Sequence, residues 1–337
     1  MLFSKKHVKV NPRCLVNTVD FSKPDLVCPD FPNKLFFYQL HMNYQEFLST
    51  VQAQLSLRIE TDVSLDIQSF TKNNGTKYDG LVILRPGRNV SPTIYLQPYY
   101  HRYLDGVCLD EICDDILNTY RTHEPKENFD TGIFTDFSRA GKRIVLRLVN
   151  YEKNTELLKQ VPYFRYLDLA VIFYCMLHAD SDNQANILIR NEHLKYWKIS
   201  KDELYDLAKK NTPKLLMPQL TPMKNILEEM HVLTEPELME SVPPLYVLTN
   251  QYRTNGAAVM IYDGLLQEVS GHLQSDLIIL PSSIHEVLLL AADESEHENM
   301  SHYNDMVKEV NEFELPDEEI LSDHAYYYSR KSNLVLA

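Results

Sequence analysis

The sequence predicts an α+β protein with mixed, largely antiparallel sheets, helices packed on them and two sub-domains. Three observations support this class: ordered apolar runs in residues 244–290, an Asn-Gly turn between two alternating runs near residue 74, and a very apolar run at residues 164–177. Apolar runs alternating with turn signals are typical of strands, and a 3.6-residue period is typical of helices. The runs in residues 244–290 are interpreted as strand, strand, helix, strand and strand, at Leu245–Leu248, Ala257–Tyr262, Leu265–Leu273, Leu277–Leu280 and Val287–Leu290.

The first 41 residues differ from the rest. They hold four prolines, a net charge of +3 and no sustained period, which is typical of an irregular extension. Asn43 is a plausible helix N-cap with Glu46 at the capping-box spacing. The folded body therefore begins near Met42, which is also a second candidate for the translation start. The predicted parts are an extension at 1–41, an α+β domain at 42–230, a Glu- and Pro-bearing linker at 231–244, and a β-β-α-β-β sub-domain with a C-terminal helix and short strands at 245–337.

The elements of residues 42–230 follow from local period and turn chemistry. Asn73-Asn74-Gly75 predicts a hairpin turn, because Asn and Gly tolerate positive φ. The run Phe164–Leu177 predicts one central strand, which Asp168 interrupts. The further predicted strands lie at 63–69, 81–84, 92–97, 143–149 and 185–190, and the helices at 43–55, 109–120, 154–161, 191–197, 200–211 and 223–230. Beyond the opening pattern, a helix is expected at His302–Phe313 with Met306, Val307 and Val310 facing inward.

Charge and composition exclude several classes of function. The chain of 337 residues carries a net charge of −14, so residues 42–337 carry −17. Such a body repels phosphate backbones and anionic membranes, and it favours solubility or a basic partner. We therefore expect no nucleic-acid and no membrane partner. Only nine glycines are present, and no apolar run is long enough to span a bilayer. The five cysteines are odd in number and form no CxxC pair, which favours reduced thiols in a cytoplasmic protein.

No nucleotide-binding, serine-hydrolase or zincin signature is present, and we expect no cofactor and no metal. The segment Ser282–Glu286 offers the nearest approach to a catalytic set, with Ser283 as nucleophile, His285 as base and Glu286 as orienter. Neighbouring residues of a strand point to opposite faces, so these three side chains would not converge on one site. A turn with helix-capping polar residues is the alternative. His297, Glu298 and His302 do not have the spacing of a helical metal site.

Binding residues are expected in two places. The turn that contains Asn250, Arg253 and Asn255 could bind an anion or a peptide carboxylate, or simply connect two strands. The chain also holds 21 tyrosines, which give large contact area at low entropic cost. The candidate contact tyrosines are Tyr99, Tyr100, Tyr103, Tyr326, Tyr327 and Tyr328.

Several segments, in one order along the chain, resemble a known family. They include NNGTKYDGLVI from Asn73, RIVLRLVNYEKN from Arg143, GAAVMIYDGLL from Gly256 and SDLIILPSSIHEVLLL from Ser275. Together with similar segments they resemble the domain-of-unknown-function family numbered 5688, an uncharacterised bacterial family of anaerobic gut bacteria, from about Met42 to Leu336. Members typically begin near the equivalent of Met42. The resemblance implies no activity, cofactor or catalytic residue.

The sequence therefore leaves two hypotheses. The first is a non-catalytic, cytoplasmic protein-interaction or binding protein, supported by the acidic, tyrosine-rich body and by the missing cofactor signatures. The second is a hydrolase-like enzyme of unrecognised type, with a site near Ser283 and His285. The ligand, the reaction and the oligomeric state do not follow from the sequence.

Overall fold

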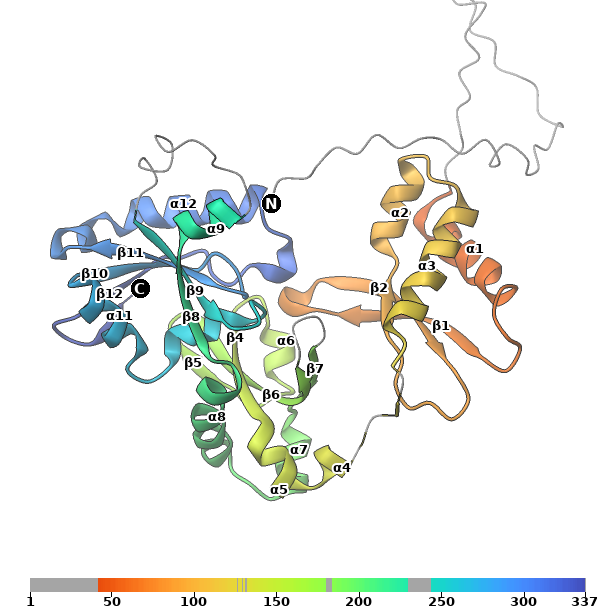
Figure 1. Cartoon of the computed structure of the whole chain (residues 1–337), viewed down its shortest axis with the longest axis horizontal. Coiled ribbons are helices and arrows are strands. Elements are labelled where there is room, and N and C mark those ends of the chain that lie inside the picture. The colour runs from red at the N-terminus through yellow and green to blue at the C-terminus, as the bar shows by residue number, and fades with distance from the viewer. Residues whose placement is uncertain are drawn as a thin grey trace, which may run out of the picture. The chain divides into compact units, whose positions relative to one another are not determined.

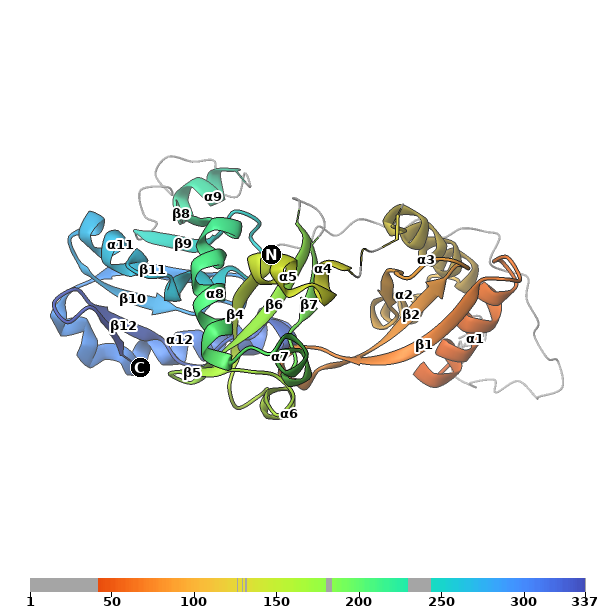
Figure 2. The same cartoon turned by 90° about the horizontal axis from the view of Figure 1, so that it is seen from below.

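The computed structural model describes residues 42–125, 127–128, 130, 132–179, 184–229 and 244–336 (Figures 1 and 2). The described strands form three antiparallel sheets, which confirms the α+β class. The chain divides into two compact units, Met1–Thr71 with Lys77–Phe129, and Lys72–Thr76 with Asp130–Ala337. The predicted extension 1–41 lies outside the described residues, and so does the predicted linker except Pro244. The predicted sub-domain boundary there stays a prediction.

In its described residues, the first unit is a three-stranded sheet with three helices. Its core contains apolar residues from α1, α3 and the sheet, among them Phe47, Leu81 and Ile112. Helix α1 begins at the predicted capping box: the Glu46 backbone N–H donates to Asn43 Oδ1 at 3.0 Å, and the Asn43 N–H donates to Glu46 Oε2 at 2.9 Å. The elements are α1 (Tyr44–Ser56), β1 (Ser64–Thr71), β2 (Lys77–Leu84), β3 (Thr93–Tyr95), α2 (Gln97–Leu104) and α3 (Leu109–His123).

The second unit contains a four-stranded and a six-stranded sheet. In the four-stranded sheet, β4 (Ile144–Asn150) pairs with the long β6 (Leu169–Ala179), which also pairs with β5 (Phe164–Tyr166) and β7 (Gln184–Leu188). The six-stranded sheet has the order β13-β12-β10-β11-β9-β8. Its strands are β8 (Pro218–Pro222), β9 (Leu245–Asn250), β10 (Asp276–Leu280), β11 (Val287–Ala292), β12 (Tyr326–Ser329) and β13 (Leu334–Leu336).

Helices cover both faces of the six-stranded sheet (Figures 1 and 2). Along β10, Leu277 and Ile279 belong to the largest core, which α11 (Leu265–Leu273) and α8 (Lys201–Leu215) share. The alternate residue Ile278 packs in a separate cluster with Val307 of α12 (Met300–Phe313). This alternation follows from the two-residue period of a strand. The remaining helical elements are α4 (Gly132–Thr135), α5 (Phe137–Ala140), α6 (Thr155–Leu158), α7 (Asn191–Trp197), α9 (Met223–Glu229) and the 3-10 turns η2 (Asn73–Gly75), η3 (Gly141–Arg143), η4 (Gly256–Ile261), η5 (Glu294–Asn299) and η6 (Asp317–Glu319).

Two predicted strands are wrong. The run Ala257–Tyr262 does not form a strand, because η4 occupies Gly256–Ile261. Gly256 lies so close to the neighbouring segments that a Cβ there would come within 2.2 Å of Thr249 Oγ1 and 2.6 Å of the His285 carbonyl oxygen. The run at 164–177 is two strands, since Leu167 adopts φ +54° and the chain reverses between β5 and β6.

The predicted inward face of α12 is also partly wrong. Val307 is buried, but 42% of Met306 and 43% of Val310 are exposed. Asn311 faces inward, and its Nδ2 donates to the Ser322 carbonyl oxygen at 2.9 Å and to Asp323 Oδ1 at 2.7 Å. Those two hydrogen bonds fix the rotation of the helix and turn Met306 and Val310 toward solvent.

Candidate functional site

The two loops predicted from the sequence as separate candidates lie together in the second unit. The backbone N–H of Asn255 donates to His285 Nδ1 at 3.1 Å. The His285 carbonyl oxygen accepts from the Gly256 N–H at 2.9 Å and from Thr249 Oγ1 at 2.8 Å. The loop after β9 and the loop before β11 are therefore joined by a set of hydrogen bonds centred on His285.

The contacts of Ser283 do not fit a nucleophile. Its side chain is buried, and its Oγ accepts the backbone N–H of His285 at 3.0 Å. A serine activated by histidine needs a hydrogen bond to the imidazole ring. The ring of His285 instead accepts from Asn255 at Nδ1, and its Nε2 lies 3.7 Å from Glu319 Oε1. Glu286 is half-buried, which raises the pKa of its carboxyl group, and it is not the carboxylate paired with His285.

Asn250 and Asn255 have structural roles in the loop that follows β9. Asn250 is fully buried; its Nδ2 donates to the Thr254 carbonyl oxygen and its Oδ1 accepts from the Tyr252 N–H, each at 2.9 Å. Asn255 has φ +50° and precedes η4. Arg253 is more accessible, and its guanidinium lies 4.0 Å from Glu229. Of the three predicted binding residues, Arg253 alone presents a charged group to solvent, and its role in binding stays a prediction.

The candidate tyrosines pack against the cores of their units, and a role of Tyr99, Tyr100 and Tyr103 in binding stays a prediction. Tyr99, Tyr100 and Tyr103 are half-buried on α2 against the core of the first unit. The Tyr100 hydroxyl donates to the Met42 carbonyl oxygen at 3.0 Å, and the Tyr99 hydroxyl lies 3.1 Å from Thr119 Oγ1. The run from Tyr326 to Tyr328 is at most 3% exposed, so these three side chains do not offer contact area to a partner.

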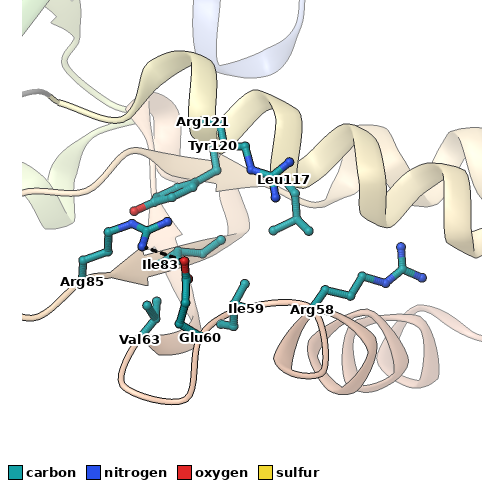
Figure 3. A pocket seen from close by; sticks show the side chains of 9 residues that line it. All are labelled: Arg58, Ile59, Glu60, Val63, Ile83, Arg85, Leu117, Tyr120 and Arg121. Carbon is teal, nitrogen blue, oxygen red and sulfur yellow. Dashed lines mark ion pairs between the residues drawn. The ribbon is translucent and has the colours of Figure 1, made fainter.

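A small pocket in the first unit gathers three arginines but is not suited to an anion. Figure 3 shows Arg85 facing Glu60 beside the Tyr120 ring, whereas Arg58 extends away from them. Arg85 pairs with Glu60 at 3.2 Å and with Glu124 at 2.9 Å. Arg58 pairs with Asp110 and Asp114. The cavity measures about 90 Å³, well below the roughly 300 Å³ at which ligand pockets begin. We interpret this pocket as a small gap between surface ion pairs and the core of the first unit.

An exposed apolar stripe runs along α12 in the second unit. It consists of Met306, Val310 and Phe313, which are 42%, 43% and 71% exposed. At 100° per residue, the spacings of three and four place these side chains on one side of the helix. Single exposed apolar residues are ordinary, but an aligned set is typical of an interaction site. These three residues are called the α12 stripe below.

Acidic residues surround the α12 stripe. Residues 293–319 hold eleven carboxylates and one lysine, a net charge of −10 within a chain of −14. Four of the exposed carboxylates form no ion pair among the described residues: Asp305, Glu309, Glu312 and Glu314. The sequence shows the charge, but the stripe was missed because Met306 and Val310 are expected in the core.

Within the described part of the chain, no three His, Cys, Asp or Glu side chains are grouped so that they could hold a metal ion. The helices of that part include none with the length and apolar character needed to cross a bilayer. In comparison with known proteins, the model of a family described as a "Family of unknown function (DUF5688)" matches residues 44–330. No curated protein and no solved structure matches the chain.

Proposed function

Since the chain belongs to the DUF5688 family of unknown function, we propose a function from its own residues: a non-catalytic protein that binds a basic protein partner through α12. The α12 stripe carries the proposal. The exposed apolar stripe matches the apolar face of an amphipathic helix. The unpaired carboxylates next to the stripe match lysine or arginine side chains that flank that face. Apolar contact supplies affinity, and opposite charge supplies a faster encounter and discrimination against acidic partners.

The test uses two synthetic helices of about 18 residues, long enough to form amphipathic helices on a surface. Both carry the same leucine face, and their polar positions are lysine in one peptide and glutamate in the other. We expect fluorescence anisotropy to detect binding of the lysine peptide only. Raising the salt concentration from about 0.05 M to about 0.5 M should weaken it at least several-fold, because salt screens exposed charges.

Two variants locate the binding surface. Phe313→Ser should weaken binding of the lysine peptide about tenfold, because the most exposed apolar side chain of the stripe is lost. Leu57→Ser is the matched control, since Leu57 is 83% exposed in the first unit. Equal loss in both variants, or equal binding of both peptides by the unmodified protein, would overturn the proposal.

A hydrolase at Ser283 and His285 is the second candidate, favoured by one observation. The Glu319 carboxylate lies 3.7 Å from His285 Nε2, as an orienting carboxylate would. The bonding of Ser283 Oγ to backbone, and its burial, count against it. We expect that p-nitrophenyl esters are hydrolysed no faster by the unmodified protein than by Ser283→Ala. A tenfold loss in that variant, with unfolding unchanged, would support the hydrolase.

We also propose that the protein acts in the cytoplasm. Cys113 and Cys175 are free and buried, which fits a reducing compartment. Cys108 does not follow the prediction of reduced cysteines, because it is disulfide-bonded, and this bond counts against a reducing compartment. Fractionation of cells that produce the protein tests the proposal, because recovery outside the cytoplasmic fraction would contradict it.

A further inference from the structure

A second cavity, in the second unit, is walled by aromatic side chains from segments far apart in the sequence. It measures about 390 Å³, within the range of roughly 300–1,000 Å³ that small-molecule pockets occupy. Among the elements that line it, β5, α8, α11 and β12 are labelled in Figure 1. Its aromatic wall consists of Phe164 and Tyr166 from β5, Tyr205 from α8, Tyr262 before α11, and Tyr328 from β12. This cavity is called the tyrosine pocket.

The tyrosines of the pocket are of two kinds. The Tyr262 hydroxyl donates to the Leu216 carbonyl oxygen at 3.0 Å, and the Tyr328 hydroxyl donates to Asn333 Oδ1 at 2.6 Å. Tyr166 and Tyr205 form no side-chain hydrogen bond among the described residues, and their hydroxyls are not among the buried side-chain atoms that lack a partner. Their hydroxyl oxygens therefore keep some exposure to solvent, and both residues line the pocket. Tyrosine hydroxyls normally find a partner when the ring is largely enclosed.

Tyr166 stays neutral at physiological pH. Burial, and then the nearby Tyr205, raise its pKa to about 12. A neutral phenol both donates and accepts a hydrogen bond, so the pocket offers both functions to a ligand.

The charged residues that line the pocket are engaged elsewhere. Asp263 pairs with Lys209 at 2.9 Å. The Arg165 guanidinium lies 4.5 Å from the centre of the Tyr151 ring, and its Nε donates to the Leu167 carbonyl oxygen at 3.2 Å. A charged ligand would therefore lose its hydration without gaining an unpaired partner of opposite sign, which is costly. These contacts favour an uncharged ligand.

We propose that the tyrosine pocket binds a neutral small molecule that carries a planar ring and one hydrogen-bonding group, of the phenol or indole class. The ring packs against Phe164 and Tyr205, whose own rings are 4.7 Å apart between centroids, in the offset or edge-on geometry that aromatic groups prefer. The hydroxyl or N–H of the ligand bonds to Tyr166 or Tyr205. This site is independent of the α12 stripe and of the function proposed from it.

Ligand-observed NMR with saturation transfer tests the proposal, using phenol, indole, benzoate and cyclohexanol as separate probes. We expect transfer to phenol and indole, and little to the anion benzoate or to the non-planar cyclohexanol. Transfer to benzoate alone would overturn the neutral class, and transfer to cyclohexanol equal to that of phenol would overturn the planar ring. No transfer to any probe at millimolar concentration would overturn the site itself.

Strand β13 supplies a matched pair of blocking variants. Val335 lines the pocket, whereas the next residue, Leu336, points to the other face and is 39% exposed. Val335→Trp should weaken phenol binding at least tenfold by filling part of the cavity, and Leu336→Trp should leave it unchanged. Thermal unfolding of both variants checks that each is folded. Equal phenol binding by the two would place the ligand elsewhere.

The hydroxyl contacts are tested by removing one oxygen at a time. Tyr166→Phe and Tyr205→Phe keep the ring and lose the hydrogen bond, and at least one of them should weaken phenol binding about 2- to 10-fold, the usual range for a neutral hydrogen bond. Tyr328→Phe is the control, because the hydroxyl of Tyr328 already bonds to Asn333. Unchanged affinity in both pocket variants would overturn the assignment of these hydroxyls.

Discussion

The tyrosines of β12 differ from Tyr166 and Tyr205 of the tyrosine pocket in whether the hydroxyl has a hydrogen-bond partner in the protein. Tyr326 donates to Asp168 Oδ1 at 2.7 Å, and Tyr327 donates to Asp276. Tyr166 and Tyr205 have no such partner among the described residues. A buried hydroxyl whose hydrogen bond is made holds the fold together, whereas a hydroxyl that lines a cavity without a protein partner is available to a ligand. Abundant tyrosine in a sequence therefore does not by itself indicate a binding surface.

The largest expected effect on the free energy of unfolding is at Asp168, which accepts the hydrogen bond of Tyr326 in β12. Its two oxygens accept from the Tyr326 hydroxyl at 2.7 Å and from Ser322 Oγ at 2.6 Å, and both donor residues are fully buried. Asp168→Ala should lower the free energy of unfolding by about 3 kcal/mol, because the buried Tyr326 hydroxyl loses its acceptor and the Ser322 hydroxyl keeps only the His324 carbonyl oxygen at 3.2 Å. Urea denaturation measures the change. Asp168→Asn keeps one acceptor and should lose about half as much; a loss below about 1 kcal/mol in Asp168→Ala would contradict the comparison.

Tyr326→Phe removes one of those donors and keeps the ring. We expect a loss of about 2 kcal/mol in the free energy of unfolding, since the lost hydrogen bond reaches a charged group. Ser322 still satisfies one oxygen of Asp168, so the effect is smaller than that of Asp168→Ala. The same urea experiment measures it, and additivity of the two losses in the double variant would show that the residues are not coupled.

The pH dependence of stability distinguishes the enclosed Tyr166 from an exposed tyrosine. The pKa of Tyr166 is about 12 in the folded protein, above the usual value of about 10. The folded state therefore holds this proton more tightly than the unfolded chain does. The contribution is complete below pH 10 and is lost as the pH rises from about 10 to about 12.

Partial exposure reduces the full linkage value, so about 1.5 kcal/mol is expected from Tyr166. The measurement is the free energy of unfolding of the unmodified protein and of Tyr166→Phe at about pH 10 and about pH 12. Other tyrosines with raised pKa values are common to both proteins and cancel in the difference. Parallel loss of stability in the two proteins would contradict the burial of Tyr166.

Local signals in the sequence predicted local structure well. The capping box of Asn43 and Glu46 and the turn at Asn73–Gly75 depend on residues only a few positions apart, and both form. The failures have long-range causes. Ala257–Tyr262 is apolar enough for a strand, but Gly256 packs against Thr249 and the His285 carbonyl, and the chain coils there.

The α12 stripe and the tyrosine pocket were harder to predict, because both depend on contacts between residues far apart in the sequence. Met306 and Val310 fit the apolar period of α12, and only the hydrogen bonds of Asn311 to Ser322 and Asp323 show that they face solvent. The tyrosine pocket joins residues from 164 to 335, which no sequence window contains. The 21 tyrosines were a usable signal, but the sequence does not show which hydroxyls find partners.

The smallest expected effect on the free energy of unfolding is at Tyr205. Its hydroxyl has no partner to lose, while its ring packs against Phe164 at 4.7 Å and Phe173 at 6.3 Å between centroids. Tyr205→Phe should therefore change the free energy of unfolding by less than about 0.5 kcal/mol, in contrast to about 2 kcal/mol for Tyr326→Phe. Urea denaturation of the two variants side by side measures the difference. A loss at Tyr205 as large as that at Tyr326 would show that its hydroxyl already belongs to the framework, and the pocket would then have only Tyr166 to offer a ligand.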